Sequence, residues 1–184
     1  MNTLSDSALM LDVKDGNIAK LGLLYERHKK RLFSFFYNMN SNSELSEDLV
    51  QSVFERMLKY KHTFTTESNF IGWMFQIARN SNYDHFKKNK KRRYDTDIST
   101  LEERINEGDS VEAQLALEED TSMLNRALNM LQADKKEILI LSKFKELKYS
   151  EIGSMLGCSE GAARTKAHRA LNDLRTLFLE LEKK

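Results

Sequence analysis

The chain has 184 residues, of which 40% are hydrophobic and 31% are charged, with a formal net charge of +1. This length can bury the core of one ordinary domain or of two small ones, and the composition is not that of a disordered chain. With no proline, only 7 glycines and 1 cysteine, long helices are favoured and an internal disulfide is excluded. No apolar run reaches the ~18 residues that would span a membrane, and the amino terminus lacks the pattern of a signal peptide. We therefore expect a cytoplasmic protein without membrane insertion.

Three helices are predicted in the first half of the chain. Apolar residues at spacings of three and four indicate one helix over about residues 21–39 and a second over about 45–57. Between them, Ser41 and Glu44 stand at the spacing of a capping box. The segment KYKHTFTTESN breaks the apolar pattern and predicts a loop. A third helix begins near Phe70 and runs into the basic segment FKKNKKRR.

The sign of the charge changes abruptly after the third helix. Residues 79–94 hold seven basic side chains and one acidic side chain, a net charge of +6. Residues 95–120 hold ten acidic side chains and one basic side chain, a net charge of −9, and lack a strong apolar period until Val111. We interpret this stretch as an acidic linker that ends in helix. The sequence therefore predicts two helical domains, at residues 1–94 and 121–184, joined by a linker at 95–120.

The second domain ends in two helical patterns with a tight corner between them. Gly157 stands where a left-handed helix end is expected, and Ser159 stands where the next helix needs its amino-terminal cap. The apolar residues that open the domain are Leu124, Leu128, Leu131, Ile138, Leu141 and Phe144. The last helix is predicted to bury an apolar stripe at helical spacing, which consists of Ala163, Ala167, Ala170, Leu171, Leu174, Leu177 and Phe178.

The opposite side of the last helix is polar and basic. Arginine and lysine can reach guanine edges or phosphates in a major groove, and Thr165 and Asn172 can hydrogen-bond bases. A helix-turn-helix needs such a helix, held by a small apolar face while its other side enters the groove. An ordinary helical hairpin with a solvated basic face is the alternative. The candidate DNA contacts are Ser159, Gly161, Arg164, Thr165, Lys166, His168 and Arg169.

The third helix and the loop before it form a second candidate surface. Amide, guanidinium, indole and phenol groups on one stripe suit hydrogen bonding and stacking on nucleic acid, and the KKNKKRR segment adds charge for phosphates. The hydroxyl-rich loop HTFTTESN can hold an unstacked base of single-stranded DNA. A solvated charge run at a helix end and a nuclear-localisation signal are the alternatives. The candidate residues are Phe64, Thr65, Ser68, Asn69, Trp73, Gln76, Arg79, Asn80, Tyr83 and Lys87.

The second helix has a different exposed stripe, with acidic and amide side chains. It consists of Asp48, Gln51, Ser52 and Glu55. DNA would repel these carboxylates, whereas a basic or mixed protein surface would not. A docking face for a partner protein and a plain solvated helix face are both consistent with this stripe.

The first half of the chain resembles conserved region 2 of bacterial RNA polymerase sigma factors, in the segments SEDLVQSVFERMLKY and FTTESNFIGWMFQIARNSNYDHFKKNKKRR. The second half resembles their region 4, in the segment LNMLQADKKEILILSKFKELKYSEIGSMLGCSEGAARTKAHRALNDLR. An acidic linker in place of a third domain is similar to the extracytoplasmic-function (ECF) group of the sigma-70 family. The resemblance covers about residues 20–94 and 121–177. It implies an all-α fold with a region 2 helical bundle and a region 4 helix-turn-helix.

The resemblance also implies a function and partners. The chain would bind core RNA polymerase and direct promoter recognition, DNA melting and transcription initiation. The third helix and its preceding loop would open the −10 element, and the last helix would read the −35 element while its domain rests on the β flap. The acidic linker would thread the polymerase channel, and an anti-sigma factor is a further candidate partner. The residues expected to contact the β′ clamp helices are Asp48, Leu49, Gln51 and Glu55.

A catalytic function finds no support in the sequence. There is no phosphate-binding glycine loop and no nucleophile elbow. The histidines and Cys158 lack the spacing of zinc ligands, so we expect neither an enzyme nor a metal or other cofactor. The main alternative to a sigma factor is a stand-alone helix-turn-helix regulator that binds duplex operators as a dimer. Such a regulator would leave the aromatic stripe and the acidic face without a function, and a module that contacts only proteins would leave the basic faces unused.

Overall fold

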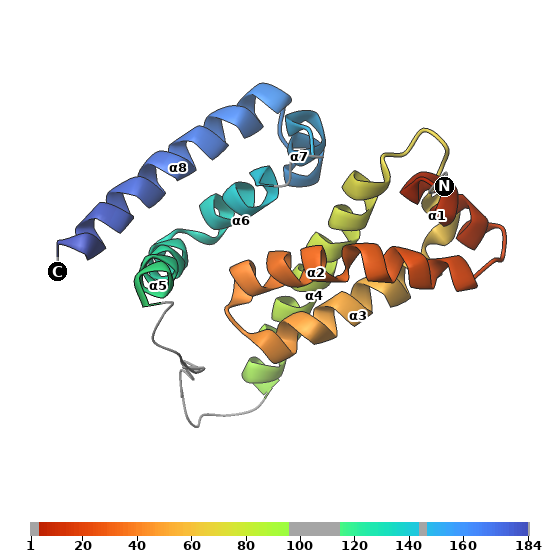
Figure 1. Cartoon of the computed structure of the whole chain (residues 1–184), viewed down its shortest axis with the longest axis horizontal. Coiled ribbons are helices and arrows are strands. Elements are labelled where there is room, and N and C mark those ends of the chain that lie inside the picture. The colour runs from red at the N-terminus through yellow and green to blue at the C-terminus, as the bar shows by residue number, and fades with distance from the viewer. Residues whose placement is uncertain (1–3, 96–114, 144–146, 184) are drawn as a thin grey trace. The chain divides into compact units, whose positions relative to one another are not determined.

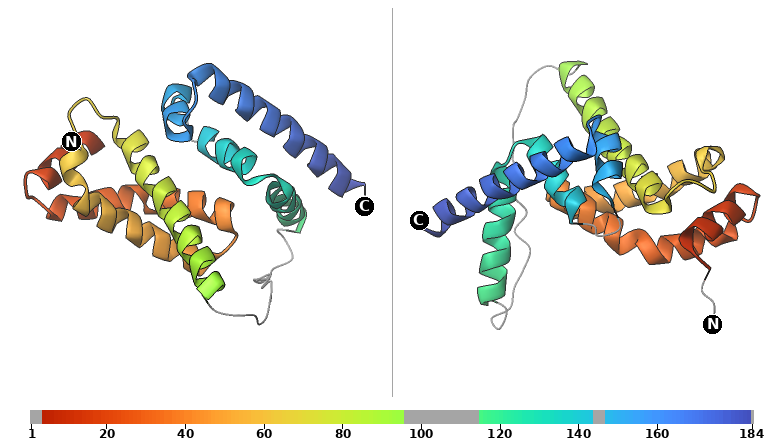
Figure 2. Two further views of the ribbon diagram at one scale, coloured as in Figure 1. Left: turned by 180° about the vertical axis from the view of Figure 1, so that it is seen from behind. Right: turned by 90° about the horizontal axis from the view of Figure 1, so that it is seen from above.

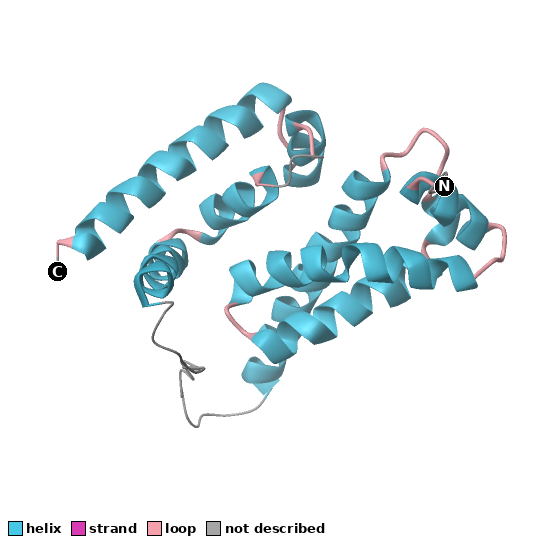
Figure 3. Cartoon of the chain, in the orientation of Figure 1, coloured by secondary structure: helices cyan, strands magenta, loops and turns pink. Residues whose placement is uncertain are grey.

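The structure is a computed structural model that describes residues 4–95, 115–143 and 147–183. Within these ranges all regular structure is helical, which confirms the predicted all-α fold (Figure 3). Contacts between residues divide the chain into two compact units, Met1–Glu103 and Arg104–Lys184. Each unit is described by itself below.

The helices of the first unit follow one another with short connections (Figure 1). They are α1 (Asp6–Lys14), α2 (Ala19–Asn40), α3 (Ser43–Lys59), the short 3-10 helix η1 (Lys61–Thr63) and α4 (Phe70–Asp95). α2, α3 and α4 correspond to the three predicted helices, and η1 lies in the predicted loop. α1 has no counterpart among the predicted helices.

The residue that caps α3 lies one position after the cap predicted at Ser41. Ser41 adopts a left-handed conformation with a φ of 51°, and this residue ends α2. Asn42 caps α3, because its side-chain oxygen accepts a hydrogen bond from the backbone N of Leu45 at 2.9 Å. The predicted cap at Ser41 is therefore wrong. Ser41 reverses the chain, and the neighbouring asparagine is an equally good capping residue.

Aromatic and aliphatic side chains from α2, α3 and α4 form the core of the first unit. The ring of Phe35 makes edge-to-face contacts with Phe36 and Phe75, at centroid distances of 5.2 and 5.4 Å. Each such ring contributes about 1.5–3 kcal/mol by leaving water. Because each helix turns its apolar stripe to this core, the opposite faces of α3 and α4 remain at the surface. The buried side chains include Leu24, Leu32, Phe35, Phe36, Leu49, Val53, Met57, Met74, Phe75 and Ala78.

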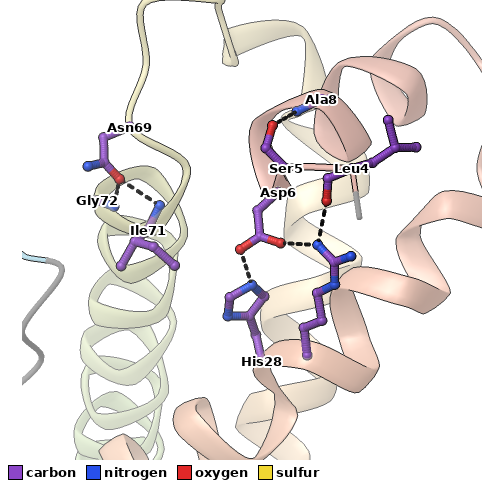
Figure 4. A network of polar contacts seen from close by, with 9 residues as sticks. Leu4, Ser5, Asp6, Ala8, His28, Asn69, Ile71 and Gly72 are labelled. Carbon is purple, nitrogen blue, oxygen red and sulfur yellow. Dashed lines mark hydrogen bonds and ion pairs between the residues drawn. The ribbon is translucent and has the colours of Figure 1, made fainter. Parts of the chain in front are cut away.

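The side chain of His28 is buried in this unit, next to α1 (Figure 4). Its Nε2 lies 2.8 Å from Oδ2 of Asp6, and Oδ1 of Asp6 accepts from Nη1 of Arg27 at 2.7 Å. Nδ1 of His28 is buried and has no hydrogen-bond partner among the described residues. Burial lowers the pKa of His28, with a smaller contribution from the charges of Arg31 and Arg27, and Asp6 offsets this only in part. The fold therefore favours the neutral imidazole.

The helices of the second unit are α5 (Leu115–Met130), α6 (Ala133–Ser142), α7 (Tyr149–Leu156) and α8 (Glu160–Glu182). α8 packs against α5, α6 and α7, as the views in Figure 1 and Figure 2 show. α5 begins inside the stretch predicted as the linker. Residues 96–114 of that linker, and Phe144 of the predicted apolar pattern, lie outside the described residues.

The corner between α7 and α8 has the predicted geometry. Gly157 ends α7 in the left-handed conformation, with a φ of +66°. Oγ of Ser159 accepts a hydrogen bond from the backbone N of Ala162 at 3.2 Å and so caps α8. The start of α8 lies close to its neighbours because its inward side chains are small. The buried residues of α8 are Ala163, Ala167 and Ala170.

Gly153 in α7 is a further requirement of this corner. A Cβ atom at this position would lie 2.6 Å from the backbone O of Cys158 and 3.2 Å from the backbone C and O of Ser159. These contacts are with backbone atoms, so relieving them would shift the start of α8. Glycine is therefore needed here for the close approach of the two helices.

Gly153→Ala is expected to destabilise the second unit. Forcing a methyl group into this contact costs roughly 1–3 kcal/mol, which should lower the unfolding temperature measured by circular dichroism. Gly161→Ala is the matched control, because a Cβ there meets open space and alanine favours the helix. An unchanged unfolding temperature for Gly153→Ala would contradict the close approach.

Acid is expected to destabilise the first unit through His28. Its pKa is lowered in the folded state, whereas in the unfolded chain it is about 6.5. The unfolded state therefore binds the proton more readily, and the stability present above about pH 6.5 is lost as the pH falls below that value. His28→Phe removes this titration, so the free energy of unfolding in urea should vary less with pH in acid. His62→Phe, a substitution of an exposed histidine, is the control. If the free energy of unfolding depends on pH equally in both variants, a group other than His28 causes the loss of stability in acid.

Candidate functional site

The outer face of α4 carries the predicted polar stripe at the surface. Asn80 and Lys87 are exposed, Tyr83 is 66% exposed, and Gln76 and Arg79 are half-buried. Nε2 of Gln76 donates to Oδ1 of Asn80 at 3.2 Å, across one turn of the helix. The stripe therefore offers an aromatic ring, an amide pair and positive charge along one line of α4.

A pocket of about 240 Å³ opens between α3 and α4 beside this stripe. An ion pair between Nη1 of Arg56 and Oδ2 of Asp84, 2.7 Å apart, joins the two helices at the pocket. Arg56 and Tyr60 are not among the candidates named from the sequence, because only the packing of α3 on α4 brings them beside Asn80 and Tyr83. The lining residues are Arg56, Tyr60, Ile77, Asn80, Tyr83 and Asp84.

Phe64 lies in the core rather than at the surface of the loop. Its side chain is fully buried, with its ring centroid 5.2 Å from that of Trp73 and 6.2 Å from that of Phe70. Trp73 is half-buried, and its Nε1 donates to Oγ1 of Thr63 at 3.1 Å. The prediction that Phe64 contacts DNA is therefore wrong, because its ring has no surface to offer a base.

The polar residues of the loop between η1 and α4 bond to one another. The backbone N of Thr65 donates to Oγ of Ser68 at 3.2 Å, and the two hydroxyl oxygens lie 2.9 Å apart. Oδ1 of Asn69 accepts from the backbone N of Ile71 and of Gly72, at 2.9 and 3.2 Å, and caps α4 (Figure 4). Asn69 therefore has a structural role in addition to its predicted DNA contact. These hydrogen bonds within the loop restrict its conformation.

The outer face of α3 presents Asp48, Gln51 and Glu55, which are all exposed. Leu49 is only 4% exposed and belongs to the core. The prediction that Leu49 contacts a partner is therefore wrong, because its side chain faces inward. A groove of about 310 Å³ borders Gln51. The sequence did not predict this groove, because its lining residues come from two helices, α2 and α3. They are Tyr25, Lys29, Lys30, Phe33, Glu47, Val50 and Gln51.

The outer face of α8 presents every predicted −35 contact at the surface. Nη2 of Arg164 lies 2.9 Å from Oε1 of Glu160, and its guanidinium lies 5.3 Å from the centroid of the Tyr149 ring. Both members of this ion pair are exposed, so water screens it and Arg164 can exchange it for another anion. Oγ1 of Thr165 donates to the backbone O of Gly161 at 2.9 Å. The exposed residues of this face are Ser159, Gly161, Arg164, Thr165, Lys166, His168 and Arg169.

An apolar pocket of about 340 Å³ lies within the second unit. Leu171, predicted to be buried, is 54% exposed and lines this pocket. That prediction is wrong because the close packing of α8 ends early, and no residue of α8 after Ala170 is buried. The apolar lining residues include Leu124, Leu128, Leu139, Ile140, Leu171 and Leu174.

The described surfaces offer hydrogen bonding, stacking and charge, which serve binding. In the part of the chain that the structure describes, no group of three or more histidine, cysteine, aspartate or glutamate side chains is placed to hold a metal ion. None of the described helices combines the length and the apolar character needed to cross a membrane.

Family models match both units of the chain. The model of sigma-70 region 2 matches residues 24–92, and that of sigma-70 region 4 matches residues 121–174. RNA polymerase sigma factor CarQ of Myxococcus xanthus is 33% identical over 163 residues, which are 86% of this chain and 89% of CarQ. ECF RNA polymerase sigma factor SigX of Bacillus subtilis is 28% identical over 159 residues, which are 83% of this chain and 80% of SigX.

A solved structure with a similar fold is that of the sigma factor RpoE in complex with the anti-sigma factor NepR from Bartonella quintana. The TM-score is 0.63 at 25% identity, and the similarity covers 85% of this chain and 94% of RpoE. Both sigma regions are thus matched, in order, over the helices that carry the exposed polar faces. The chain therefore belongs to the ECF group of the sigma-70 family of RNA polymerase sigma factors, and its function is promoter-directed transcription initiation.

Proposed function

We propose that the two units contact one promoter at two places while the chain is bound to core RNA polymerase. α4 and the loop before it open the −10 element, α8 reads the −35 element, and the outer face of α3 docks on the β′ clamp helices. One observation carries this proposal. α4 and α8 each bury one side in a core and present amide or hydroxyl groups together with basic groups on the other.

The pocket beside Asn80 and Tyr83 takes an unstacked base of the melted −10 element. Stacking of a base on an aromatic ring contributes about 1–3 kcal/mol, and Tyr83 presents a ring that is 66% exposed. The amide of Asn80 supplies a donor and an acceptor for the edge of the base. This pocket replaces Phe64 in the predicted capture of a base. The other proposed −10 contacts are Thr65, Ser68, Asn69, Trp73, Gln76, Arg79 and Lys87.

α8 enters the major groove of the duplex −35 element. Arg164 and Arg169 reach guanine edges or phosphates from its exposed face, and Thr165 lies between them in the chain. The amino-terminal end of α8, at Ser159 and Gly161, favours a phosphate through its free backbone N–H groups. Lys166 and His168 complete the proposed contact set.

The remaining surfaces bind the polymerase. DNA repels the exposed carboxylates of Asp48 and Glu55. The outer face of α3, which also includes Gln51, therefore contacts a protein surface, that of the β′ clamp helices. The apolar pocket with the exposed Leu171 suits a protein contact, and we assign it to the β flap. The threading of the acidic linker through the polymerase channel is part of the same proposal, although residues 96–114 lie outside the described residues.

As a dissociable subunit, the chain acts in the cytoplasm and leaves catalysis to the polymerase. The structure of RpoE with NepR, at 25% identity, supports an anti-sigma factor as a further partner of this chain. A stand-alone regulator that binds operators is not retained, because both sigma regions are matched and no observation favours it.

With core RNA polymerase added, the chain should support run-off transcription from a subset of genomic promoter fragments.

Asp48→Lys combined with Gln51→Ala should weaken the binding of the chain to core RNA polymerase by roughly tenfold or more, because contacts in the centre of a docking face are lost. The dissociation constant can be measured by fluorescence anisotropy with the labelled chain.

The control for this variant is Glu180→Lys, an exposed charge change on α8 that should leave core binding intact. Circular dichroism should show the same helix content in both variants. Unchanged core affinity for the α3 variant would remove the docking role of that face. Failure of the wild-type chain to support any transcription would refute the proposed function as a whole.

Arg164→Ala and Arg169→Ala should each weaken the binding of holoenzyme to promoter DNA and reduce its salt dependence. Each phosphate contact that is lost lowers the slope of log affinity against log salt by about 0.9. Binding can be measured by filter retention at several KCl concentrations. Arg126→Ala on α5 is the control and should leave the slope unchanged. Equal slopes for all variants and the wild type would exclude phosphate contacts at α8.

A further inference from the structure

α1 lies outside the residues matched by the sigma-70 region 2 model, which begin at residue 24, and none of the functions above uses it. The helix has only nine residues, and a helix of that length is marginal by itself in water. Its inward side chains Leu9, Met10 and Val13 are nevertheless fully buried, and Ser5 caps its first turn. Tertiary contacts therefore hold α1 in place.

The carboxyl-terminal end of α1 is tied to the loop that precedes α4. Nζ of Lys14 donates to the backbone O of Phe64 at 2.6 Å, in a partly buried position. In the reverse direction, Nζ of Lys61 donates to the backbone O of Val13 at 3.3 Å. Hydrogen bonds from a charged donor are stronger than those between neutral groups. Each segment thus donates one lysine to a backbone carbonyl of the other, Lys14 to that of Phe64 and Lys61 to that of Val13.

Phe64 is the residue of the loop whose position matters most. Its ring is buried against Trp73 from one side, and Lys14 holds its backbone carbonyl. The neighbours of Phe64 are the residues that make the polar surface of the loop. Thr63 accepts from the indole of Trp73, and Thr65 bonds to Ser68. A displacement of Phe64 would therefore displace the hydroxyl groups on both sides of it.

The amino-terminal end of α1 is linked, through α2, to the first residue of α4, which follows the same loop. Asp6 bonds to His28 and to Arg27, as Figure 4 shows for His28. The ring of His28 in turn lies 5.2 Å from that of Phe70, the first residue of α4. α1 therefore bonds to the loop near its start, through Lys14 and Phe64. It is linked to the first residue of α4 only indirectly, from Asp6 through His28 of α2 to Phe70.

We infer that α1 is a positioning element for promoter opening, with Lys14 as the positioning residue that holds the loop between η1 and α4 in its binding conformation. This inference rests on the proposed role of that loop and of α4 at the −10 element. A flexible loop loses conformational entropy when its hydroxyl and amide groups bind DNA, and a loop already fixed by α1 avoids that loss. Lys14 touches no DNA in this scheme and acts through Phe64.

The first test measures the loop itself in the full-length chain. Lys14→Met keeps the apolar stem and removes the donor, whereas Lys14→Arg keeps a donor. Lys20→Met, in the first turn of α2, is the matched control. The backbone amides of Thr63, Phe64 and Ser68 donate to carbonyls of residues 60–65. Their hydrogen exchange should be roughly tenfold faster than in the wild type in Lys14→Met, and unchanged in Lys14→Arg and Lys20→Met. Exchange in α8 should not change.

The second test measures promoter opening by the holoenzyme. Lys14→Met should slow open-complex formation on duplex promoter by roughly tenfold, and a template already unpaired at the −10 element should restore much of the rate. Lys14→Arg and Lys20→Met should behave as the wild type, and core affinity should be the same for all. A merely structural role would instead lower core binding and slow both templates equally.

Besides equal slowing on both templates, two further outcomes overturn the inference. One is unchanged exchange of the loop amides in Lys14→Met. The other is faster exchange with no loss of opening on the duplex template. The proposed function is tested separately by Thr65→Val combined with Ser68→Ala, which should impair opening whether or not α1 positions the loop. Normal opening in that variant would count against the loop's role at the −10 element.

Discussion

The packing of Phe64 against Trp73 and Phe70 joins the loop after η1 to the start of α4, and the polar surface of this part of the first unit depends on it. Burial of the Phe64 ring contributes roughly 1.5–3 kcal/mol toward holding this short connection in one conformation. The indole of Trp73 then donates to Thr63, so the same contact also orients a hydroxyl group. The polar groups of the loop stay at the surface because one aromatic ring anchors the backbone beneath them.

The second unit reaches a comparable division of faces with small residues instead of aromatic rings. Gly153 allows the backbone of the corner to approach α7, and alanines allow α8 to lie close to its neighbours. The buried alanines thus face the neighbouring helices, and the basic side of α8 remains open to solvent. The charges of the exposed faces also differ between helices. Although the net charge of the chain is only +1, acidic groups lie on α3 and basic groups lie on α4 and α8. In the proposed function, like charges repel α3 from DNA, whereas opposite charges attract α4 and α8 to it.

The sequence by itself determined the all-α fold and the exposed faces of α3, α4 and α8, which are local or periodic features. The two sigma regions followed from the resemblance of its segments to the family. A helix in a small domain must bury its apolar stripe, so the spacing of apolar residues predicts which side stays bare. The corner at Gly157 and Ser159 was predictable for the same reason, because a left-handed helix end and an amino-terminal cap depend on residues within a few positions of each other.

Only the tertiary structure decided which residues of those regions reach the surface. Phe64 lies in a polar loop without a period, so its burial could not be predicted, and Leu49 stands beside an exposed stripe that its own side chain does not join. α1 is too short to show a clear apolar period, and Lys14 is held by a carbonyl 50 residues away in the sequence. The pocket beside Asn80 likewise exists only because α3 packs on α4. Contacts between distant segments depend on how helices pack, which residue spacing does not encode.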